Sequence, residues 1–406
     1  MFNSRNIVSA VEFGTSKICV LLGEVRPNGK LEFLGAGEVA APGAVVKGEI
    51  SNMKRTVEAL REAFELAEQK ADCDSSNCSI ITVVATGGGI ESHQEIAGVT
   101  INNANGVVTE NDKNAVSEAA RRIAYSNGRE IINLCTSSFT LDQRHVVEPR
   151  GQSGKYLEAD VHIVSVNSRR LDTFIQALRE AGFEDSRVEP VFTPLADVNG
   201  SVDEDEQQNG FILLDIGAGT TEYLLNIDGG VRESGVIRVG MEHVANDLAI
   251  GLALPIEKCR SLLRNGTIAD ALRDKTEFLE LPARPKHIRK IPVSSCECII
   301  EARLRELIQI VRKKIPAKHN LNTLGAGGLL TGGGALYPPL KEIFTSVFDI
   351  PCRTVGPIRP GASSLEDPRY SSVWGALTLA PEFIEPQEQP GMLERLFSSF
   401  TRGGRG

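Results

Sequence analysis

The chain alternates between short apolar runs and segments in which apolar residues recur every three or four positions. Apolar runs predict strands at residues 18–25, 31–40, 80–86, 157–166 and 211–215, and a pair of strands within residues 130–141. Helical spacing predicts helices at residues 53–70, 110–125, 171–181, 298–314 and 368–379. Strands that alternate with helices are typical of layered α/β proteins, so we expect this fold class.

Two other segments give less regular patterns. Residues 203–206 (DEDE) predict a solvated acidic loop before the strand at residues 211–215. Residues 242–315 predict mainly helices. Gly182 directly follows the helix expected at residues 171–181, which agrees with the preference for glycine just after a helix.

Composition narrows the possible classes of protein. The 406 residues include 41% hydrophobic residues, enough for two to four domains or subdomains. A net charge of −9 argues against a general nucleic-acid binder, which needs a basic surface. No signal-type or membrane-spanning apolar stretch is present, so we expect neither export nor a membrane span. The eight cysteines lack the spacing of a zinc site and predict free thiols.

Three segments run from an apolar strand into a glycine-bearing turn: residues 9–17 (SAVEFGTSK), 213–221 (LLDIGAGTT) and 329–335 (LLTGGGA). The first two are near-repeats, with an acidic residue, an apolar residue, glycine, a small residue and a hydroxyl residue. Glycine permits a turn whose backbone N–H groups point at a phosphate oxygen. One such turn is commonly an ordinary hairpin. Two copies with a third glycine cluster predict one nucleotide site.

With these segments the chain resembles the actin, Hsp70 and sugar-kinase superfamily. Residues 130–142, 149–154 (PRGQSG), 157–164 (LEADVHIV) and 239–252 resemble the bacterial cell-division family FtsA in particular. The resemblance implies an actin-like two-lobed ATPase fold with an inserted subdomain 1C and a C-terminal amphipathic helix. The implied parts are 1A (residues 1–78, 161–205 and 365–380), 1C (79–160), 2A (206–241 and 316–364), 2B (242–315), a linker (381–390) and a tail (391–406).

The resemblance implies that ATP and Mg²⁺ bind between the lobes. Asp215 and Glu12 would hold Mg²⁺ through its water shell, because Mg²⁺ keeps several waters and needs few carboxylates. A similar run at residues 86–89 (TGGG) opens the inserted subdomain, and we interpret it as a structural turn. Ala218 stands where the family has a glycine. The implied nucleotide-binding residues are Gly14, Thr15, Ser16, Lys17, Asp215, Gly217, Ala218, Gly219, Thr220 and Thr221 at the phosphates, and Gly332, Gly333, Gly334 and Ala335 under the purine and ribose.

Other positions also depart from the family pattern. Glu12 replaces an aspartate and is one methylene longer. Cys259 and Leu262 align with a glutamate and a lysine that contact the nucleoside, unless a shifted register brings Glu257 and Lys258 there. Phosphoryl transfer depends on positioning and on metal-assisted charge stabilisation. We therefore hypothesise that the protein is at most a slow ATPase and that ATP acts as an assembly ligand.

The C-terminal segment has an amphipathic pattern. After the spacer at residues 381–390, apolar residues recur on one face of a predicted helix, and arginines could meet anionic headgroups. A short terminal helix docked on its own core is the alternative. The predicted membrane residues are Met392, Leu393, Arg395, Leu396, Phe397, Phe400 and Arg402.

The family resemblance implies a specific cellular role. It implies an actin-like division protein that forms filaments, tethers the tubulin-like ring protein FtsZ to the cytoplasmic face of the cell membrane, and recruits later division proteins. Subdomain 2B would meet FtsZ, and 1C would serve filament contacts and recruitment. Two alternatives remain open at this point: a scaffold like the pilus-assembly protein PilM, and a small-molecule kinase of the same fold.

Overall fold

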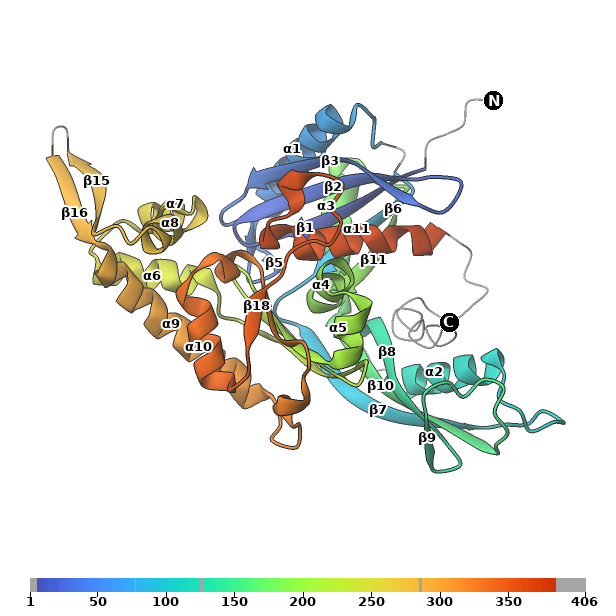
Figure 1. Cartoon of the computed structure of the whole chain (residues 1–406). Helices are drawn as coiled ribbons and strands as arrows, with labels where there is room; N and C mark the ends of the chain where they lie inside the picture. The colour runs from blue at the N-terminus through green and yellow to red at the C-terminus, as the bar shows by residue number, and fades with distance from the viewer. Residues whose placement is uncertain (1–5, 77, 125–127, 285–286, 385–406) are drawn as a thin grey trace.

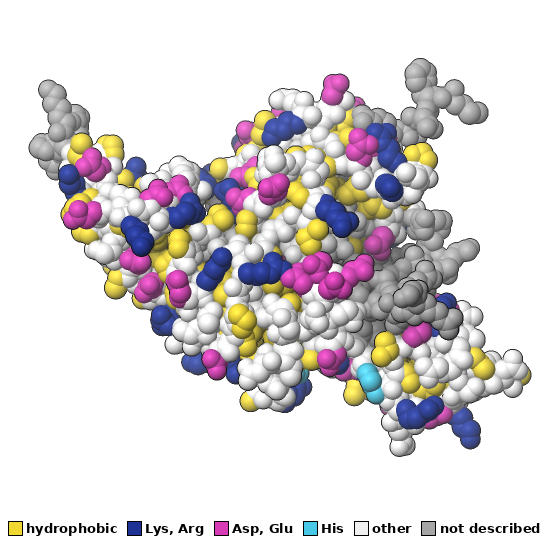
Figure 2. Space-filling model, viewed as in Figure 1, with side chains coloured by type: hydrophobic (Ala, Val, Ile, Leu, Met, Phe, Trp, Pro, Cys, Tyr) yellow, Lys and Arg dark blue, Asp and Glu magenta, His cyan; other side chains and the backbone are white. Residues whose placement is uncertain are grey.

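The computed structural model describes residues 6–76, 78–124, 128–284 and 287–384 (Figure 1). Within this range it confirms an α/β fold with two lobes and an inserted subdomain. Basic and acidic side chains are interspersed on the face shown in Figure 2. The seven predicted membrane residues lie outside the described residues. Helix α11 (Ser371–Ile384) extends into the segment predicted as a linker.

One sheet forms the centre of the first lobe. Its strands are β1 (Ile7–Phe13), β2 (Lys17–Val25), β3 (Leu31–Ala40), β6 (Ile80–Ala85) and β11 (Arg187–Phe192), in the order β11-β6-β1-β2-β3. Strands β1, β2 and β3 are antiparallel neighbours, whereas β6 and β11 run parallel to β1. Phe13 packs against α1 (Met53–Ala71) and α3 (Ser168–Ala181). Ala10 packs against α11 on the opposite face, as the two-residue period of a strand requires.

The second lobe repeats this topology. Its strands are β12 (Phe211–Ile216), β13 (Thr221–Ile227), β14 (Gly230–Ile237), β17 (Gly327–Thr331) and β18 (Cys352–Thr354), in the order β14-β13-β12-β17-β18. Again an antiparallel meander is followed by two parallel strands. The two near-repeat sequence segments therefore form the turns at equivalent places, between β1 and β2 and between β12 and β13.

The inserted subdomain has its own sheet. Its strands are β7 (Ile90–Thr100), β8 (Arg129–Leu141), β9 (Arg144–Val146) and β10 (Tyr156–Asn167), in the order β7-β10-β8-β9. Helix α2 (Glu110–Ala124) packs on one face of this sheet. Strand β6 lies in the first-lobe sheet, and β10 runs to Asn167, so the sheet of the inserted subdomain comprises strands between residues 90 and 167. Residues 130–141 form one strand rather than the predicted pair, because both halves pair with β10 across β-bulges.

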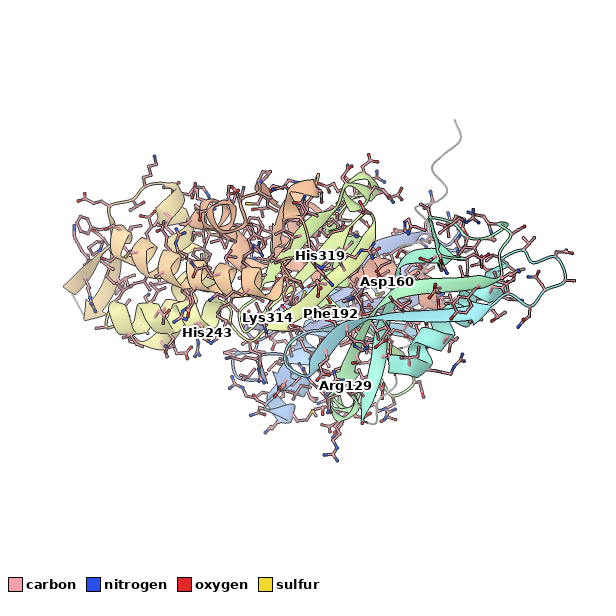
Figure 3. The ribbon with its side chains drawn as sticks, turned by 90° about the horizontal axis from the view of Figure 1, so that it is seen from below. Arg129, Asp160, Phe192, His243, Lys314 and His319 are labelled. Carbon is pink, nitrogen blue, oxygen red and sulfur yellow. The ribbon has the colours of Figure 1, made fainter. Side chains whose placement is uncertain are left out.

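The inserted subdomain is joined to the first lobe by polar contacts. The Arg129 guanidinium donates a hydrogen bond of 2.9 Å to the Gly89 carbonyl oxygen. The Phe192 backbone N–H donates to Asn133 Oδ1 at 2.8 Å. Figure 3 shows Arg129 and Phe192 where the two sheets approach each other.

The outer part of the second lobe contains helices and one hairpin. The helices are α6 (Met241–Gly251), α7 (Ile256–Arg264), α8 (Thr267–Arg273) and α9 (Val293–Lys314), and the hairpin is β15 (Phe278–Arg284) with β16 (His287–Pro292). The prediction of mainly helices for residues 242–315 was wrong at the hairpin. Leu279 and Leu281 are buried while Phe278 is exposed, so a short two-residue period was present in the sequence.

The lobes are connected by α4 (Thr193–Ser201), α5 (Glu204–Asn209) and the residues that lead into α11. The acidic run at 203–206 is not a loop. The Asp203 side chain accepts from the Glu206 N–H at 2.9 Å and the Glu206 side chain accepts from the Asp203 N–H at 3.2 Å, forming a capping box that starts α5.

The described chain also contains helix α10 (Pro339–Phe348) and the short strand pair β4 (Val45–Val46) and β5 (Glu49–Ile50). None of the eight cysteines, all of which lie in the described part of the chain, forms a disulfide, as the sequence predicts. In the part of the chain that the structure describes, no helix has both the length and the apolar character needed to cross a bilayer.

Candidate functional site

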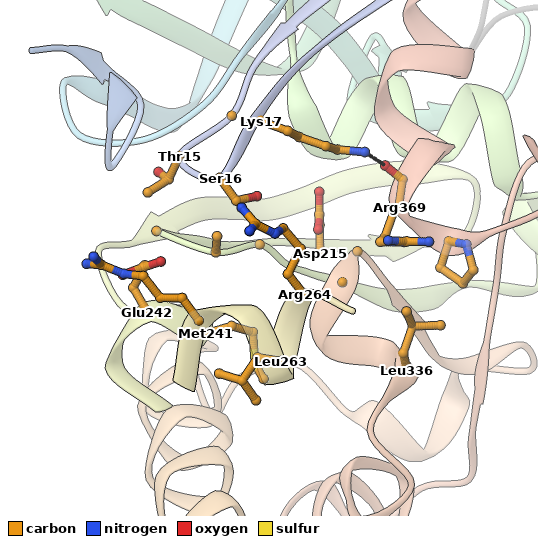
Figure 4. Close-up of a pocket in the computed structure, with 18 of the residues that line it drawn as sticks. Thr15, Ser16, Lys17, Asp215, Met241, Glu242, Leu263, Arg264, Leu336 and Arg369 are labelled. Carbon is orange, nitrogen blue, oxygen red and sulfur yellow. Dashed lines mark hydrogen bonds and ion pairs between the residues drawn. The ribbon is translucent and has the colours of Figure 1, made fainter. Parts of the chain in front are cut away.

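A cavity of about 640 Å³ lies between the two lobes (Figure 4). The turns after β1 and β12 and the glycine turn after β17 all contribute to its wall. The structure thus brings together three segments that are far apart in the sequence. Of the predicted site residues, those that line the cavity are Glu12, Gly14, Thr15, Ser16, Lys17, Asp215, Gly217, Ala218, Gly219, Thr220, Gly332 and Gly333.

Three predicted contact residues lie behind the wall instead of on it. The Thr221 hydroxyl is directed away from the cavity and donates to the Val239 carbonyl oxygen at 2.9 Å. Gly334 packs so closely on Ile216 that a side chain there would collide with it, and Ala335 is buried. All three residues belong to the glycine-bearing segments, but tertiary packing turns them toward the interior of the second lobe and away from the cavity.

The two turns touch across the lobes. A Cβ atom at Gly219 would collide with the Thr15 hydroxyl, so glycine is needed for this approach. The Thr15 hydroxyl in turn accepts a hydrogen bond of 3.1 Å from the Lys47 backbone N–H, which lies between β4 and β5. Thr15 therefore helps to fix the turn through its side chain.

The second turn is held by the start of α6. The backbone N–H groups of Met241 and Glu242 donate to the carbonyl oxygens of Gly217 and Ala218 at 3.0 and 2.8 Å. The Gly217 N–H donates to Thr220 at 3.0 Å and closes the hairpin. Since the carbonyl oxygens are bound on one side, the shape of the turn is fixed before any ligand arrives.

Lys17 is already paired. Its ammonium lies 2.9 Å from Glu38 Oε2 and 3.5 Å from the Arg369 carbonyl oxygen, and it sits over the Tyr370 ring at 4.3 Å (Figure 4). Burial lowers the pKa of Lys17, but the surrounding negative groups, including Glu12, outweigh burial and raise it above its usual value. Lys17 stays charged, and a phosphate would have to compete with Glu38 for it.

Four buried carboxyl groups surround the end of β12: Glu12, Asp197, Asp215 and Glu222. Burial raises the pKa of Asp215 well above its ordinary value, and Glu222 and Glu12 raise it further. Burial also raises the pKa of Glu12 and raises that of Glu222 to about 7. The negative charges of these groups repel one another, and the Lys17 ammonium offsets this only in part.

Several carboxylate oxygens in this cluster accept no hydrogen bond. Among the described residues no donor reaches Glu12 Oε2 or either oxygen of Asp197, although all three atoms are buried. Buried polar atoms without partners are rare and commonly mark an ion or water. The residues present therefore fit Mg²⁺. No three His, Cys, Asp or Glu side chains in the described range are arranged to ligate a metal, so the ion would keep much of its water shell.

Helix α7 faces the cavity with three charged residues, of which only Glu257 was considered from the sequence. Glu257, Arg260 and Arg264 line the cavity, whereas Cys259 and Leu262 are buried in the core of the second lobe. Glu257 thus takes one of the alternative positions considered from the sequence, and Lys258 does not line the cavity. The spacing of three and four residues from Glu257 to Arg264 is the signal that could have identified this face.

Other cavity residues were missed because they come from distant segments. Thr86 lines the cavity, and its hydroxyl donates to Glu222 Oε1, so the run at 86–89 is part of the wall as well as a turn. The Gly87 N–H donates to the same oxygen at 3.3 Å. Asp197 could have been noticed as the one charged residue in the otherwise uncharged stretch 190–202.

Solved structures share the fold. The PilM-PilN type IV pilus biogenesis complex matches with a TM-score of 0.57 and 17% identity over 93% of this chain and 99% of that chain. MreB5 of Spiroplasma citri bound to ADP matches with a TM-score of 0.51 and 12% identity over 94% of this chain and 97% of that chain. At these identities the likeness shows the fold alone.

Sequence comparisons give the family. The family model of the SHS2 domain inserted in FTSA matches residues 87–165, and that of the cell division protein FtsA matches residues 212–375. FtsA of Borreliella burgdorferi is 30% identical over 98% of this chain and 96% of its own length. FtsA of Escherichia coli K12 is 27% identical over 93% of this chain and 91% of its own length. The duplicated lobes and the cavity between them define an actin-like protein. Within that class, the chain belongs to the family of the cell division protein FtsA.

Proposed function

We propose that this protein binds ATP with Mg²⁺ in the cavity between the lobes. The observation that carries the proposal is the meeting of two equivalent hairpin turns, one from each lobe, at a single cavity. Backbone N–H groups of such turns bind phosphate oxygens. Asp215 and Glu12 would hold Mg²⁺, which offsets the charge of the phosphates when it is bound.

The same site is suited to binding more than to rapid hydrolysis. Lys17 is engaged by Glu38, and Glu12 carries its carboxylate on a longer side chain than the family's aspartate. Fast phosphoryl transfer needs both positioning and charge stabilisation. ATP therefore acts chiefly as a ligand that sets the arrangement of the lobes and favours assembly. A turnover near one per second in the absence of partners would contradict this.

We further propose that the protein forms filaments and attaches the FtsZ ring to the membrane at the division site, where it recruits later division proteins. Family membership supports this role over a pilus scaffold or a small-molecule kinase. The tail predicted from the sequence has five large apolar side chains, each worth about 1.5–3 kcal/mol when fully buried. Ordering about ten residues costs a comparable amount, so one tail binds weakly. Many tails along a filament would bind together strongly.

Co-sedimentation with liposomes tests the proposal. The full chain and a truncation that ends at Gln389 are compared on anionic and neutral vesicles, with and without Mg-ATP. We expect pelleting that needs the tail, prefers anionic lipid and increases with ATP. Equal pelleting of both chains would remove the tail as an anchor. A separate titration with a fluorescent ATP analogue shows whether nucleotide binds at all.

A further inference from the structure

Helix α4 carries a charged group in an unusual place. Eight of its nine residues are buried, and Asp197 is 0% exposed. Neither oxygen of its carboxyl group accepts a hydrogen bond from a described residue. A buried carboxylate without donors or a cation is strongly unfavourable, so something must compensate it in the working protein.

The neighbours of Asp197 increase the free-energy cost of burying its negative charge. Asp215 is close enough for the two carboxyl groups to share a proton, and Glu222 and Glu12 lie within electrostatic range. The Lys17 ammonium, which interacts electrostatically with Glu12 and Asp215, is paired with Glu38. Together with Glu12 Oε2, three buried carboxylate oxygens near Asp215 have no donor. A cation bound beside these oxygens would compensate their charge.

The carboxyl cluster lies where the two lobes are joined. Helix α4 follows β11 of the first lobe directly and leads through α5 to β12 of the second lobe. Asp215 lines the cavity, and Asp197 lies behind it, away from the cavity wall. A cation in the cavity beside Asp215 would therefore be attracted by charges from the connecting helix, from β12 and, through Glu12, from the first lobe.

We propose that Asp197 is a positioning residue of a divalent-cation site, in which Asp215 holds Mg²⁺ in the cavity through the ion's water shell and Asp197 supplies a second negative charge directly behind it. The absence of three converging ligands in the described range agrees with an ion that retains its waters. This inference deepens the Mg²⁺ part of the proposed function but does not require nucleotide, so the two can fail separately.

A shared proton is the other way to neutralise Asp197 and Asp215, and the two explanations predict different responses to metal. The experiment titrates the full chain with Mn²⁺ alone, without nucleotide, and follows free Mn²⁺ by electron paramagnetic resonance. We expect saturable binding to the unmodified protein and at least tenfold weaker binding to Asp197→Asn. Asp197→Glu, which keeps the charge, should retain most of the affinity. Asp172→Asn, at an exposed position of α3, is the matched control and should bind as the unmodified protein does.

Thermal melts separate this role from a purely structural one. Without metal, Asp197→Asn should melt at the same or a higher temperature than the unmodified protein, because a repulsion is removed. Added Mg²⁺ should then raise its melting temperature much less. Equal Mn²⁺ affinity in both proteins, or no Mn²⁺ binding by the unmodified protein, would overturn the proposal. If Asp197→Asn does not fold, the Asp197→Glu titration decides: loss of Mn²⁺ binding in a folded, charge-retaining variant contradicts a charge-based role.

Discussion

The Nε2 atom of His162 lies 2.7 Å from the Ser234 hydroxyl, and this contact joins the inserted subdomain to the second lobe. On its other side, His162 Nδ1 lies 2.6 Å from Gln94 Oε1. Beside it, Arg232 on β14 pairs with Asp160 at 2.9 Å, and Figure 3 shows Asp160 on the inserted sheet. The inserted subdomain thus belongs to the first lobe by chain connection but is also fixed to the edge strand of the second lobe.

Acid should weaken this junction. Burial lowers the pKa of His162 to about 3, so the folded protein keeps the ring neutral while the unfolded chain binds a proton near its ordinary pKa of 6.5. The stability that the neutral ring contributes is present above pH 6.5 and is lost as the pH falls, by about 1.4 kcal/mol per pH unit. Urea unfolding at pH 7, 6 and 5 should show that the free energy of unfolding falls less with pH in His162→Gln than in the unmodified protein. In His145→Gln, at an exposed site, it should fall as much as in the unmodified protein.

Glu222 should change the stability of the protein with pH in the opposite direction to His162. Its pKa is raised to about 7, chiefly by burial, so the folded protein binds a proton more tightly than the unfolded chain. In metal-free buffer its contribution to stability is complete below the ordinary pKa of 4.5 and decreases as the pH rises to about 7. Thermal melts with EDTA should find Glu222→Gln more stable than the unmodified protein at pH 8, with no difference near pH 4. A variant that is less stable at both pH values would show that the contacts with Thr86, not the charge, dominate.

Arg264 should contribute to nucleotide affinity. Of the cationic side chains in the described cavity wall, Lys17, Arg260, Arg273 and Arg369 each have a carboxylate partner. Within the described residues Arg264 forms no such pair, and its side chain projects into the cavity in Figure 4. Removing an unpaired guanidinium that can bind phosphate should weaken nucleotide binding about tenfold, or about 1.4 kcal/mol. Calorimetric titration of Arg264→Gln with Mg-ATP measures this, and Arg273→Gln is the paired control.

Shortening Glu12 should strengthen binding of Mg-ATP. Glu12 lines the cavity, and its side chain is one methylene longer than the aspartate of the family pattern, so its carboxylate is displaced from the position that an aspartate would give it. Glu12→Asp restores the shorter carboxylate of the family pattern, and we expect an increase in affinity of about fivefold to tenfold, or about 1 kcal/mol. Calorimetric titration of Glu12→Asp with Mg-ATP measures this change in affinity. Unchanged affinity would place Glu12 outside the metal and phosphate contacts.

Local patterns in the sequence were sufficient for the regular elements and for the turns. The apolar run of β1 is buried on both faces of its sheet, and the helical spacing in α1 gives the buried face of that helix, because a side chain's face depends only on its position in the element. The glycines at 217 and 219 indicated the second turn, whereas the close approach of Gly219 to Thr15 of the other lobe is seen only in the structure. Even the missed capping box of α5 was present locally, as an aspartate three residues before a glutamate.

Tertiary structure decided what the site contains. Asp197, Glu222 and Arg264 lie in different segments, and only the packing of two lobes brings Glu222 and Arg264 into one cavity with Asp197 behind its wall. The face that α7 presents was settled by burial of Cys259 and Leu262 in the second-lobe core. The raised pKa values of the carboxyl groups likewise follow from burial and from their mutual distances. The sequence determined the α/β elements, the paired turns and the family, since these depend on residues close together in the chain. The charge balance of the site required the fold, because long-range packing alone sets which charges meet and how little water reaches them.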